Sequence, residues 1–406
     1  MTGDIWTSPT HCTLPTKQLA FRHYEHGVLK NAWPCCNMMT DGYVEFGIPD
    51  VHLLTPQEIF DHPKMQELRD NLANGVRDPR CNVCWKMEDK GLKSYRQASL
   101  EDRSPDNWDF GFRRVDLRVG NTCNLRCRMC DTYYSHSLMI DYRYFEKNDL
   151  LDEMKHTIDF PWTPTNQENN PADDDRQWQW LMEHTREITC IRASGGEPLY
   201  DRRMLDLLRR YIDSRRAGHT ILHFHTNVTQ MSDEILDMLS QFKKNDHDFS
   251  VDGTGLTYEY IRHGSSFELI NSNIRRYLDR IQPLKLKLVM TVNSLNVLDV
   301  GNYLRWVKTF NYPYRIHFQP TGPYNRGIAL HHMPVHLLET AMQRLIEGSG
   351  DNQEVDSNLL RRIELAISNN KANRDKMLRE ITLFDRSRDQ SYRYFLDHAL
   401  VNWLDG

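Results

Sequence analysis

Between residues 112 and 323, short apolar runs alternate with segments whose apolar residues recur at helical spacing. This alternation predicts β-α units stacked around a parallel sheet. The expected strands are 113–120, 187–195, 220–227, 248–253, 284–292 and 314–320. The helical pattern is clearest in 204–216, 233–244, 267–281 and 303–310.

Six such units are fewer than the eight of a closed α/β barrel, so we expect a partial (βα)6 TIM-like barrel that is open at one side. It would occupy residues 112–350. Residues 1–111 hold five cysteines and little periodicity, which predicts a cysteine-rich auxiliary element held together by metal. Residues 351–406 are expected to form a helical tail. The polar, proline-containing stretch 156–180 predicts a surface insertion that could act as a lid.

The composition of the chain excludes some classes of protein. The 406 residues carry 51 lysines and arginines against 56 aspartates and glutamates, a net charge of −5, which gives no overall attraction for nucleic acid. No apolar run reaches the roughly 18 residues of a membrane helix, and the first residues do not resemble a signal peptide. We therefore expect no membrane partner and a cytoplasmic location. In that reducing compartment the clusters among the nine cysteines are expected to be metal ligands sooner than disulfide partners.

Three cysteines directly follow the first expected strand: Cys123, Cys127 and Cys130, in the motif "CNLRCRMC". A structural zinc site closes with four ligands, whereas a metal centre that performs chemistry keeps one position open. The motif "SGGEP" follows the second strand, and its two glycines allow close approach of the backbone to a ligand. With a strand before each motif, the pair resembles the radical SAM superfamily. The alternative is a zinc site with a remote fourth ligand.

This resemblance implies a chemistry. Three thiolates would hold three irons of a 4Fe-4S cluster, and S-adenosylmethionine would chelate the fourth iron. An electron from an external donor such as flavodoxin or ferredoxin would then cleave S-adenosylmethionine. The resulting 5′-deoxyadenosyl radical would abstract hydrogen from a substrate.

The resemblance also implies cofactor-binding positions around the first two strands. Ser194, Gly195, Gly196 and Glu197 lie where the family binds the methionine amino group. Met129 stands where the family usually has an aromatic residue next to adenine, so this contact departs from the usual pattern.

Later strands supply further expected cofactor contacts. Ser250 and Arg262 match positions that meet the methionine moiety, and Asn293 matches a ribose-binding position. The alternatives are a solvated cation at a helix end for Arg262 and a structural cap for Asn293. Thr226 and Asn227, at the end of the third strand, are candidates on the substrate side.

The front cysteines resemble the auxiliary-cluster element of the SPASM/twitch subgroup, placed ahead of the barrel. The positions that fit its order are Cys12, Gly27, Cys35, Cys81 and Cys84. Four thiolates would close a second 4Fe-4S cluster. The alternative for the same cysteines is a zinc ribbon.

Two further cysteines have less certain roles. Cys36 is the second choice after Cys35, because adjacent cysteines seldom bind one metal. Cys190 lies within an expected strand, which predicts a buried free thiol.

The substrate expected from the SPASM/twitch resemblance is a peptide or protein side chain. A nucleotide, nucleoside or nucleic acid base is the alternative. A different class is a non-enzymatic iron-sulfur or zinc scaffold, which would form no 5′-deoxyadenosine from S-adenosylmethionine.

Overall fold

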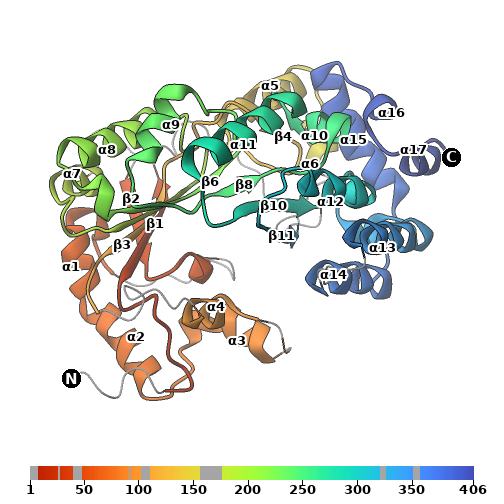
Figure 1. Ribbon diagram of the computed structural model, residues 1–406. Helices are drawn as coiled ribbons and strands as arrows, with labels where there is room; N and C mark the ends of the chain where they lie inside the picture. Colours follow the sequence, from red (N-terminus) through yellow and green to blue (C-terminus); the bar gives the residue numbers. More distant parts are fainter. Residues whose placement is uncertain are drawn as a thin grey trace. The chain divides into compact units, whose positions relative to one another are not determined.

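The computed structural model describes residues 8–25, 28–39, 48–89, 91, 93–101, 110–155, 176–320, 326–350 and 357–406. These residues contain a nine-stranded sheet of order β11-β10-β8-β6-β5-β3-β1-β2, with β7 (Lys244–Asn245) paired to β6 (Figure 1). The chain forms two compact units. The first comprises Met1–Gly120, Gln167–Phe224 and Gln241–Asn245, and the second comprises Asn121–Asn166, His225–Ser240 and Asp246–Gly406.

All six expected barrel strands are present. They are β3 (Arg114–Arg118), β5 (Cys190–Ser194), β6 (Ile221–Thr226), β8 (Asp248–Ser250), β10 (Leu286–Val292) and β11 (Tyr314–Pro320). Each pairs in parallel with the next in chain order. The mixed α/β class with a parallel sheet is therefore confirmed, and it is consistent with a partial barrel of the radical SAM type.

The helices between these strands follow the apolar spacing of the sequence. Their bounds are α8 (Arg202–Asp213), α9 (Asp233–Ser240), α10 (Gly255–Ile261), α11 (Phe267–Ile281) and α12 (Val300–Lys308). In α8, the Asp201 side chain accepts a hydrogen bond from the Met204 backbone N–H at 3.1 Å and so caps the first turn. The buried residues of α8 recur every three to four positions, as expected for one face packed on a sheet.

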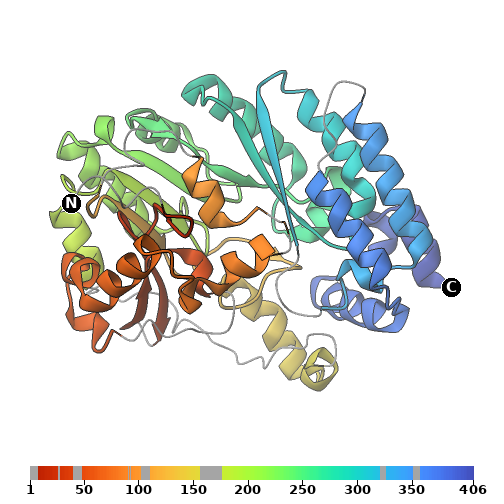
Figure 2. The same cartoon turned by 90° about the horizontal axis from the view of Figure 1, so that it is seen from below.

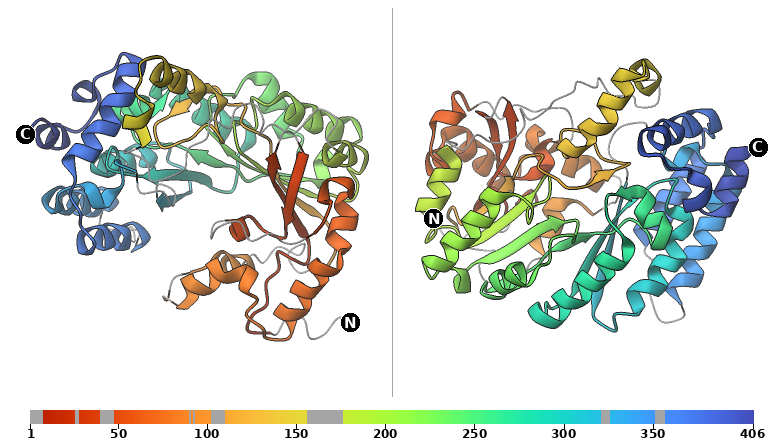
Figure 3. Two further views of the ribbon diagram at one scale, coloured as in Figure 1. Left: turned by 180° about the vertical axis from the view of Figure 1, so that it is seen from behind. Right: turned by 90° about the horizontal axis from the view of Figure 1, so that it is seen from above.

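Apolar periodicity did not predict two strands of the first unit, although the resemblance to the auxiliary-cluster element implies a short hairpin at Gly27. β1 (Gln18–Glu25) pairs in parallel with β3 and antiparallel with β2 (Val28–Trp33), both red in Figure 3. A strand buried between two neighbours need not alternate apolar and polar residues, so periodicity does not reveal it. The same unit contains η1 (Cys36–Met39), η2 (Val51–Leu53), α1 (Pro56–Asp61), α2 (Pro63–Ala73), η3 (Pro79–Cys81), α3 (Asn82–Asp89), α4 (Tyr95–Leu100), α7 (Arg176–Glu183) and η7 (Ala217–His219).

The second unit contains the expected helical tail, blue in Figure 2. Its helices are η9 (Leu330–His332), α13 (Val335–Ser349), α14 (Ser357–Ser368), α15 (Arg374–Arg388), α16 (Tyr392–Phe395) and α17 (His398–Asp405). Leu383 and Phe384 of α15 pack against Leu138 and Phe145 in a shared core. The neighbours of α15 are thus α5 (Met139–Lys147) and α6 (Leu151–Lys155), which follow the three-cysteine motif.

Some expectations concern residues outside the described ranges. The central part of the expected insertion, 156–175, and Gly27 are among them. The predicted boundaries at 111 and 350 stay predictions. Within the described part of the chain, no helix has both the length and the apolar character needed to cross a lipid bilayer.

Candidate active site

The three cysteines of "CNLRCRMC" lie in a loop of the second unit. A two-residue strand, β4 (Arg126–Cys127), holds this loop by antiparallel pairing with β9 (Arg262–His263), so that Cys127 lies opposite Arg262. Cys123 and Cys127 are buried around Leu125, and the partly buried Met129 and Cys130 pack against them. The loop therefore gathers its three thiols around a small apolar core.

Hydrogen bonds from the segment after the loop fix its backbone. His136 Nδ1 lies 3.1 Å from the Cys123 backbone N–H, and the Ser137 hydroxyl donates to the Cys123 carbonyl at 2.5 Å. The Ser135 hydroxyl donates to the Leu125 carbonyl at 2.6 Å. These contacts come from Ser135 and the adjoining η5 (His136–Leu138), so the start of the next helical segment determines the path of the loop.

Two arginines join the loop to the tail helix α15. The buried Arg128, between Cys127 and Cys130 in the chain, donates from Nη2 to Asp385 Oδ1 at 2.5 Å, and its guanidinium lies 3.6 Å from the Tyr260 ring centroid. Arg326 donates to the Arg128 carbonyl at 2.6 Å and to the Cys130 carbonyl at 3.2 Å. Its guanidinium also pairs with Glu380 at 2.6 Å. The Arg326 guanidinium thus holds the loop backbone, and Glu380 compensates its charge.

A third buried pair lies next to this one. Arg388 Nη2 donates to Asp141 Oδ2 at 2.9 Å, and both side chains are completely buried. Arg126 donates to the other oxygen of Asp141 at 3.1 Å. The sequence pattern did not indicate any of these acidic partners as site residues, because they lie far from the motif in the chain and only the fold brings them to it.

Arg262, an expected cofactor contact, has an acidic partner of its own. Its Nε donates to Asp252 Oδ2 at 2.6 Å, and Asp252 Oδ1 accepts from the Thr291 backbone N–H at 2.6 Å. Burial raises the pKa of Asp252, and the Arg262 guanidinium opposes this shift. Arg262 is a buried, oriented cation and not a solvated one, and Asp252 is its positioning residue.

The other expected contacts of the second unit have local roles in the structure. Ser250 ends β8 and lies opposite Val289 of β10. Asn293 accepts from the Leu295 backbone N–H at 2.9 Å and donates to the Thr291 carbonyl at 3.0 Å, which is the cap geometry of the alternative interpretation. Asn227 donates to Asn124 Oδ1 at 3.0 Å, so this residue contacts the cysteine loop.

The "SGGEP" motif leaves the end of β5 in the first unit. Gly195 has φ of +81°, and a Cβ there would meet Arg118 Cγ at 2.7 Å, so only glycine fits. The Ser194 carbonyl accepts from the Val119 backbone N–H at 3.0 Å. Glu197 is fully buried, and its Oε1 accepts from the Leu199 backbone N–H at 3.2 Å. The motif thus forms a tight turn that contains a buried carboxylate.

The front cysteines also converge, within the first unit. Cys12, Cys35, Cys81 and Cys84 line one pocket of about 400 Å³, including its open mouth, together with Tyr95 and other residues. Cys36 is not among the lining residues. Burial raises the pKa of Cys12 to about 11 and raises the pKa of Cys35 well above its usual value.

Polar contacts hold the pocket walls together. Arg96 of α4 forms a two-point pair with Glu88 of α3 at 3.0 and 2.7 Å, and donates to the His11 carbonyl at 2.7 Å. His11 directly precedes Cys12, and α3 carries Cys84. Arg96 therefore ties two cysteine-bearing segments to each other.

The spacing of the thiols bears on which metal group would fit. Among the described residues, one group of three or more histidine, cysteine or acidic side chains has all its ligand atoms within 4.8 Å of one another. This group contains no cysteine. Tetrahedral zinc with Zn–S of about 2.3 Å would place its sulfurs about 3.8 Å apart. An iron-sulfur cluster binds each thiolate to a different iron, so the sulfurs lie farther apart. In neither cysteine site do three sulfurs all lie within 4.8 Å of one another. Cys190 is a buried free thiol at the start of β5.

One family model matches part of the chain. Residues 117–306 match the family model described as the radical SAM superfamily. Similar solved structures include SuiB of Streptococcus suis bound to S-adenosylmethionine, at 9% identity and TM-score 0.35, over 70% of this chain and 49% of that chain. Another is polyhistidine-tagged anSMEcpe with bound AdoMet, at 15% identity and TM-score 0.35, over 58% of this chain and 60% of that chain. The matches thus cover between half and three-fifths of those two chains. A comparison with curated proteins finds no match.

The matched segment begins within β3 and ends within α12, and it includes both the three-cysteine loop and the "SGGEP" turn. Residues 117–306 are therefore the part of this chain that is similar to the radical SAM superfamily.

Proposed function

We propose that Cys123, Cys127 and Cys130 hold a 4Fe-4S cluster with one iron open to S-adenosylmethionine. When bound, these cofactors supply reductive cleavage to a 5′-deoxyadenosyl radical that abstracts hydrogen from a substrate. The observation that carries this proposal is the loop itself. It gathers three thiols after the first barrel strand and adds no fourth protein ligand within its own sequence.

The chain's own residues would bind and orient S-adenosylmethionine. Arg262 is oriented through Nε by Asp252, and its terminal nitrogens make no hydrogen bond among the described residues, so they can meet a carboxylate. The buried carboxylate of Glu197 suits an ammonium group, and Gly195 lets the backbone turn next to it. Ser194, Gly196, Met129, Ser250 and Asn293 complete the proposed cofactor contacts.

A second 4Fe-4S cluster on Cys12, Cys35, Cys81 and Cys84 is part of the proposal. The shared pocket and the spacing of the sulfurs support it over a zinc ribbon. The position of Cys36 outside the lining supports Cys35 as the ligand. Such an auxiliary element would assign the chain to the SPASM/twitch subgroup.

For the substrate we propose a peptide or protein side chain, on the resemblance to that subgroup, with an external one-electron donor and a cytoplasmic location. Nucleotides and nucleosides are the competing substrates for the assay. If the enzyme selectively modifies a nucleotide or nucleoside, that substrate replaces the peptide in this proposal. The proposed radical chemistry would still hold.

The test is the iron content and the cofactor cleavage of anaerobically reconstituted protein. Wild type should hold about eight irons per chain, at four per cluster, and should form 5′-deoxyadenosine from S-adenosylmethionine under strong reductant. Cys127→Ala should hold about four irons and form none.

Two further variants complete the test. The double change of Cys81 and Cys84 to alanine should also hold about four irons, whereas the matched control Cys36→Ala should keep about eight. Wild type that forms no 5′-deoxyadenosine with any reductant would contradict the proposal and favour a scaffold.

A further inference from the structure

We propose that Asn227 is a positioning residue for the Cys123 sulfur, and that its amide raises the reduction potential of the 4Fe-4S cluster proposed for the three-cysteine loop. The inference rests on the proposed function, which assigns that cluster. Asn227 Nδ2 donates to Cys123 Sγ at 3.9 Å, and both residues are buried within the second unit. Hydrogen bonds to the sulfurs are among the features that set the potential of an iron-sulfur cluster.

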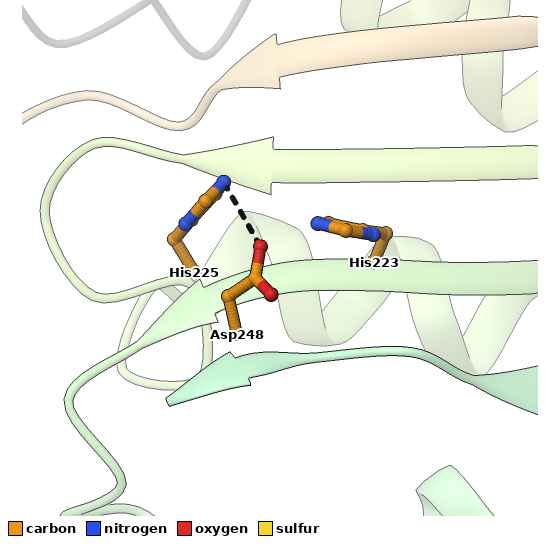
Figure 4. Close-up of side chains that lie close together, drawn as sticks. All are labelled: His223, His225 and Asp248. Carbon is orange, nitrogen blue, oxygen red and sulfur yellow. Dashed lines mark ion pairs between the residues drawn. The ribbon is translucent and has the colours of Figure 1, made fainter. Parts of the chain in front are cut away.

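The end of strand β6 fixes the position of the Asn227 backbone. His225 and Thr226, the last two residues of β6, pair in parallel with Asp248 and Phe249 of β8. His225 Nε2 also lies 3.6 Å from Asp248 Oδ2 (Figure 4). Asn227 follows directly, so it leaves a strand end that a neighbouring strand of the same unit holds in place.

The turn after β6 contains a strained residue. Val228 is completely buried and has φ of +64°, a backbone conformation that β-branched residues rarely adopt. Its N–H donates to Thr226 Oγ1 at 3.1 Å, and Asn273 of α11 donates to its carbonyl at 2.8 Å. Such strain persists only where the surrounding structure imposes it, and it is concentrated at functional sites. Here the strained residue is next to the one whose amide meets Cys123.

The hydrogen bonds of Asn227 determine which end of its amide faces the sulfur. Its Oδ1 accepts from the Thr229 backbone N–H at 3.0 Å and from the Thr229 hydroxyl at 2.7 Å. A backbone N–H can only donate, so the oxygen points to Thr229 and the NH₂ group points to the cysteine loop. The two hydrogens of this group suffice for Asn124 Oδ1, at 3.0 Å, and for Cys123 Sγ.

A purely structural role would explain part of this network. Asn124 Nδ2 donates to the Thr229 hydroxyl at 2.9 Å, so Asn227, Asn124 and Thr229 form a closed ring of hydrogen bonds. This ring would hold the turn against the loop without any contact to a sulfur. The donor to Cys123 is therefore the contact that the structural role leaves unexplained.

That donor acts on the sulfur and not on the backbone. His136 and Ser137 already hold the backbone N–H and carbonyl of Cys123. A sulfur bound to a cluster becomes more negative when the cluster gains an electron, and a hydrogen bond to a charged acceptor is stronger than one to a neutral acceptor. The Asn227 amide would thus stabilise the reduced cluster more than the oxidised one, which raises the reduction potential.

The test is the midpoint potential of the cluster in the anaerobically reconstituted whole chain, followed by EPR. The signal that Cys127→Ala removes belongs to the three-cysteine loop. Asn227→Leu keeps the size of the side chain and loses the donor. The ratio of reduced to oxidised cluster at a fixed potential should then fall about tenfold, as for the loss of one hydrogen bond to a charged group. For a one-electron couple this is a shift of about 59 mV to lower potential.

Thr229→Val is the matched control. It breaks the ring at the hydroxyl, but Asn227 Oδ1 keeps the backbone N–H of residue 229 and its amide keeps the donor to the sulfur. The potential should therefore stay close to that of wild type. Asn227→Asp keeps the shape of its side chain and replaces the donor with a negative charge. It should also lower the potential, and it carries the test if Asn227→Leu fails to fold.

The outcomes separate this inference from the proposed function. An unchanged potential in Asn227 variants that bind the cluster would overturn the inference alone. So would a shift in Thr229→Val as large as that in Asn227→Leu, because the ring would then set the potential. Identical signals in wild type and Cys127→Ala would contradict the proposed function, and this inference with it.

Discussion

Glu380→Gln should destabilise the second unit and loosen the three-cysteine loop. Glu380 is the counter-ion of Arg326, with 2.6 Å between Oε1 and Nη2 and side chains only 2% and 6% exposed. Glutamine keeps the shape and the accepting oxygen but removes the charge. The Arg326 guanidinium, which holds the Arg128 and Cys130 carbonyls, would then be a buried cation without a counter-ion.

The size of the expected destabilisation follows from the burial of this ion pair. Removing one partner of a buried ion pair costs about 3–5 kcal/mol, because the remaining charge stays desolvated. For a unit of this size that corresponds to a fall in Tm of about 6–20 °C, at roughly 2–4 °C per kcal/mol. The matched control is Glu364→Gln. Its partner Arg361 lies at 3.3 Å, and the two side chains are 50% and 61% exposed, so the change should cost less than about 1 kcal/mol.

Thermal unfolding of the anaerobic holoprotein would measure the loss of stability. Its iron content would measure the loosening of the three-cysteine loop. A second variant separates stability from loop position. Changing Arg326 and Glu380 together to methionine should restore most of the stability, since apolar replacement of a buried pair is often neutral. It still removes the donors to the two loop carbonyls, so iron at the three-cysteine site should stay low. If Glu380→Gln unfolds like Glu364→Gln and keeps all its iron, the pair does not hold the loop.

Three further predictions concern single residues. Glu197→Gln should weaken S-adenosylmethionine binding by about 1–3 kcal/mol in equilibrium titration, and unchanged affinity would limit Glu197 to its turn. Gly195→Ala should destabilise by about 1–3 kcal/mol in denaturant unfolding, because of its positive φ and the close Arg118, while Gly218→Ala, with open space around it, should be near neutral. Burial lowers the pKa of His263 from 6.5 to about 4, with nearby arginines adding to the shift, so stability that is present above pH 6.5 should fall as pH drops towards 4. His263→Gln should flatten that part of the unfolding profile, and an unchanged profile would show that other groups cause it.

Local patterns predicted the barrel strands well because each strand is an apolar run bounded by helices. They did not predict β1 and β2, whose stability comes from neighbours: β1 lies between β2 and β3. The boundary of β8 was also missed, since the extended stretch of 248–253 continues after the ladder ends at Ser250. Hydrogen-bonded pairing determines where a strand ends, and the sequence does not state it.

The cysteine spacing likewise predicts a set of ligands, but it does not indicate which residues position them. Asp252 follows Ser250 in the chain by two residues, yet its role depends on Arg262 and on the Thr291 backbone.

Arg128 explains why the helical tail belongs to the same unit as the three-cysteine loop. An arginine in such a loop would ordinarily be expected at the surface, because a buried guanidinium needs a counter-ion. Here the side chain is 2% exposed, and Asp385 supplies that counter-ion from α15. Glu380, five residues earlier on α15, does the same for Arg326, whose donors reach the loop backbone. Both acids come after residue 306, where the superfamily match ends. The charges that make this loop stable therefore lie outside the segment that matches the family model, so the loop and α15 must fold as one unit.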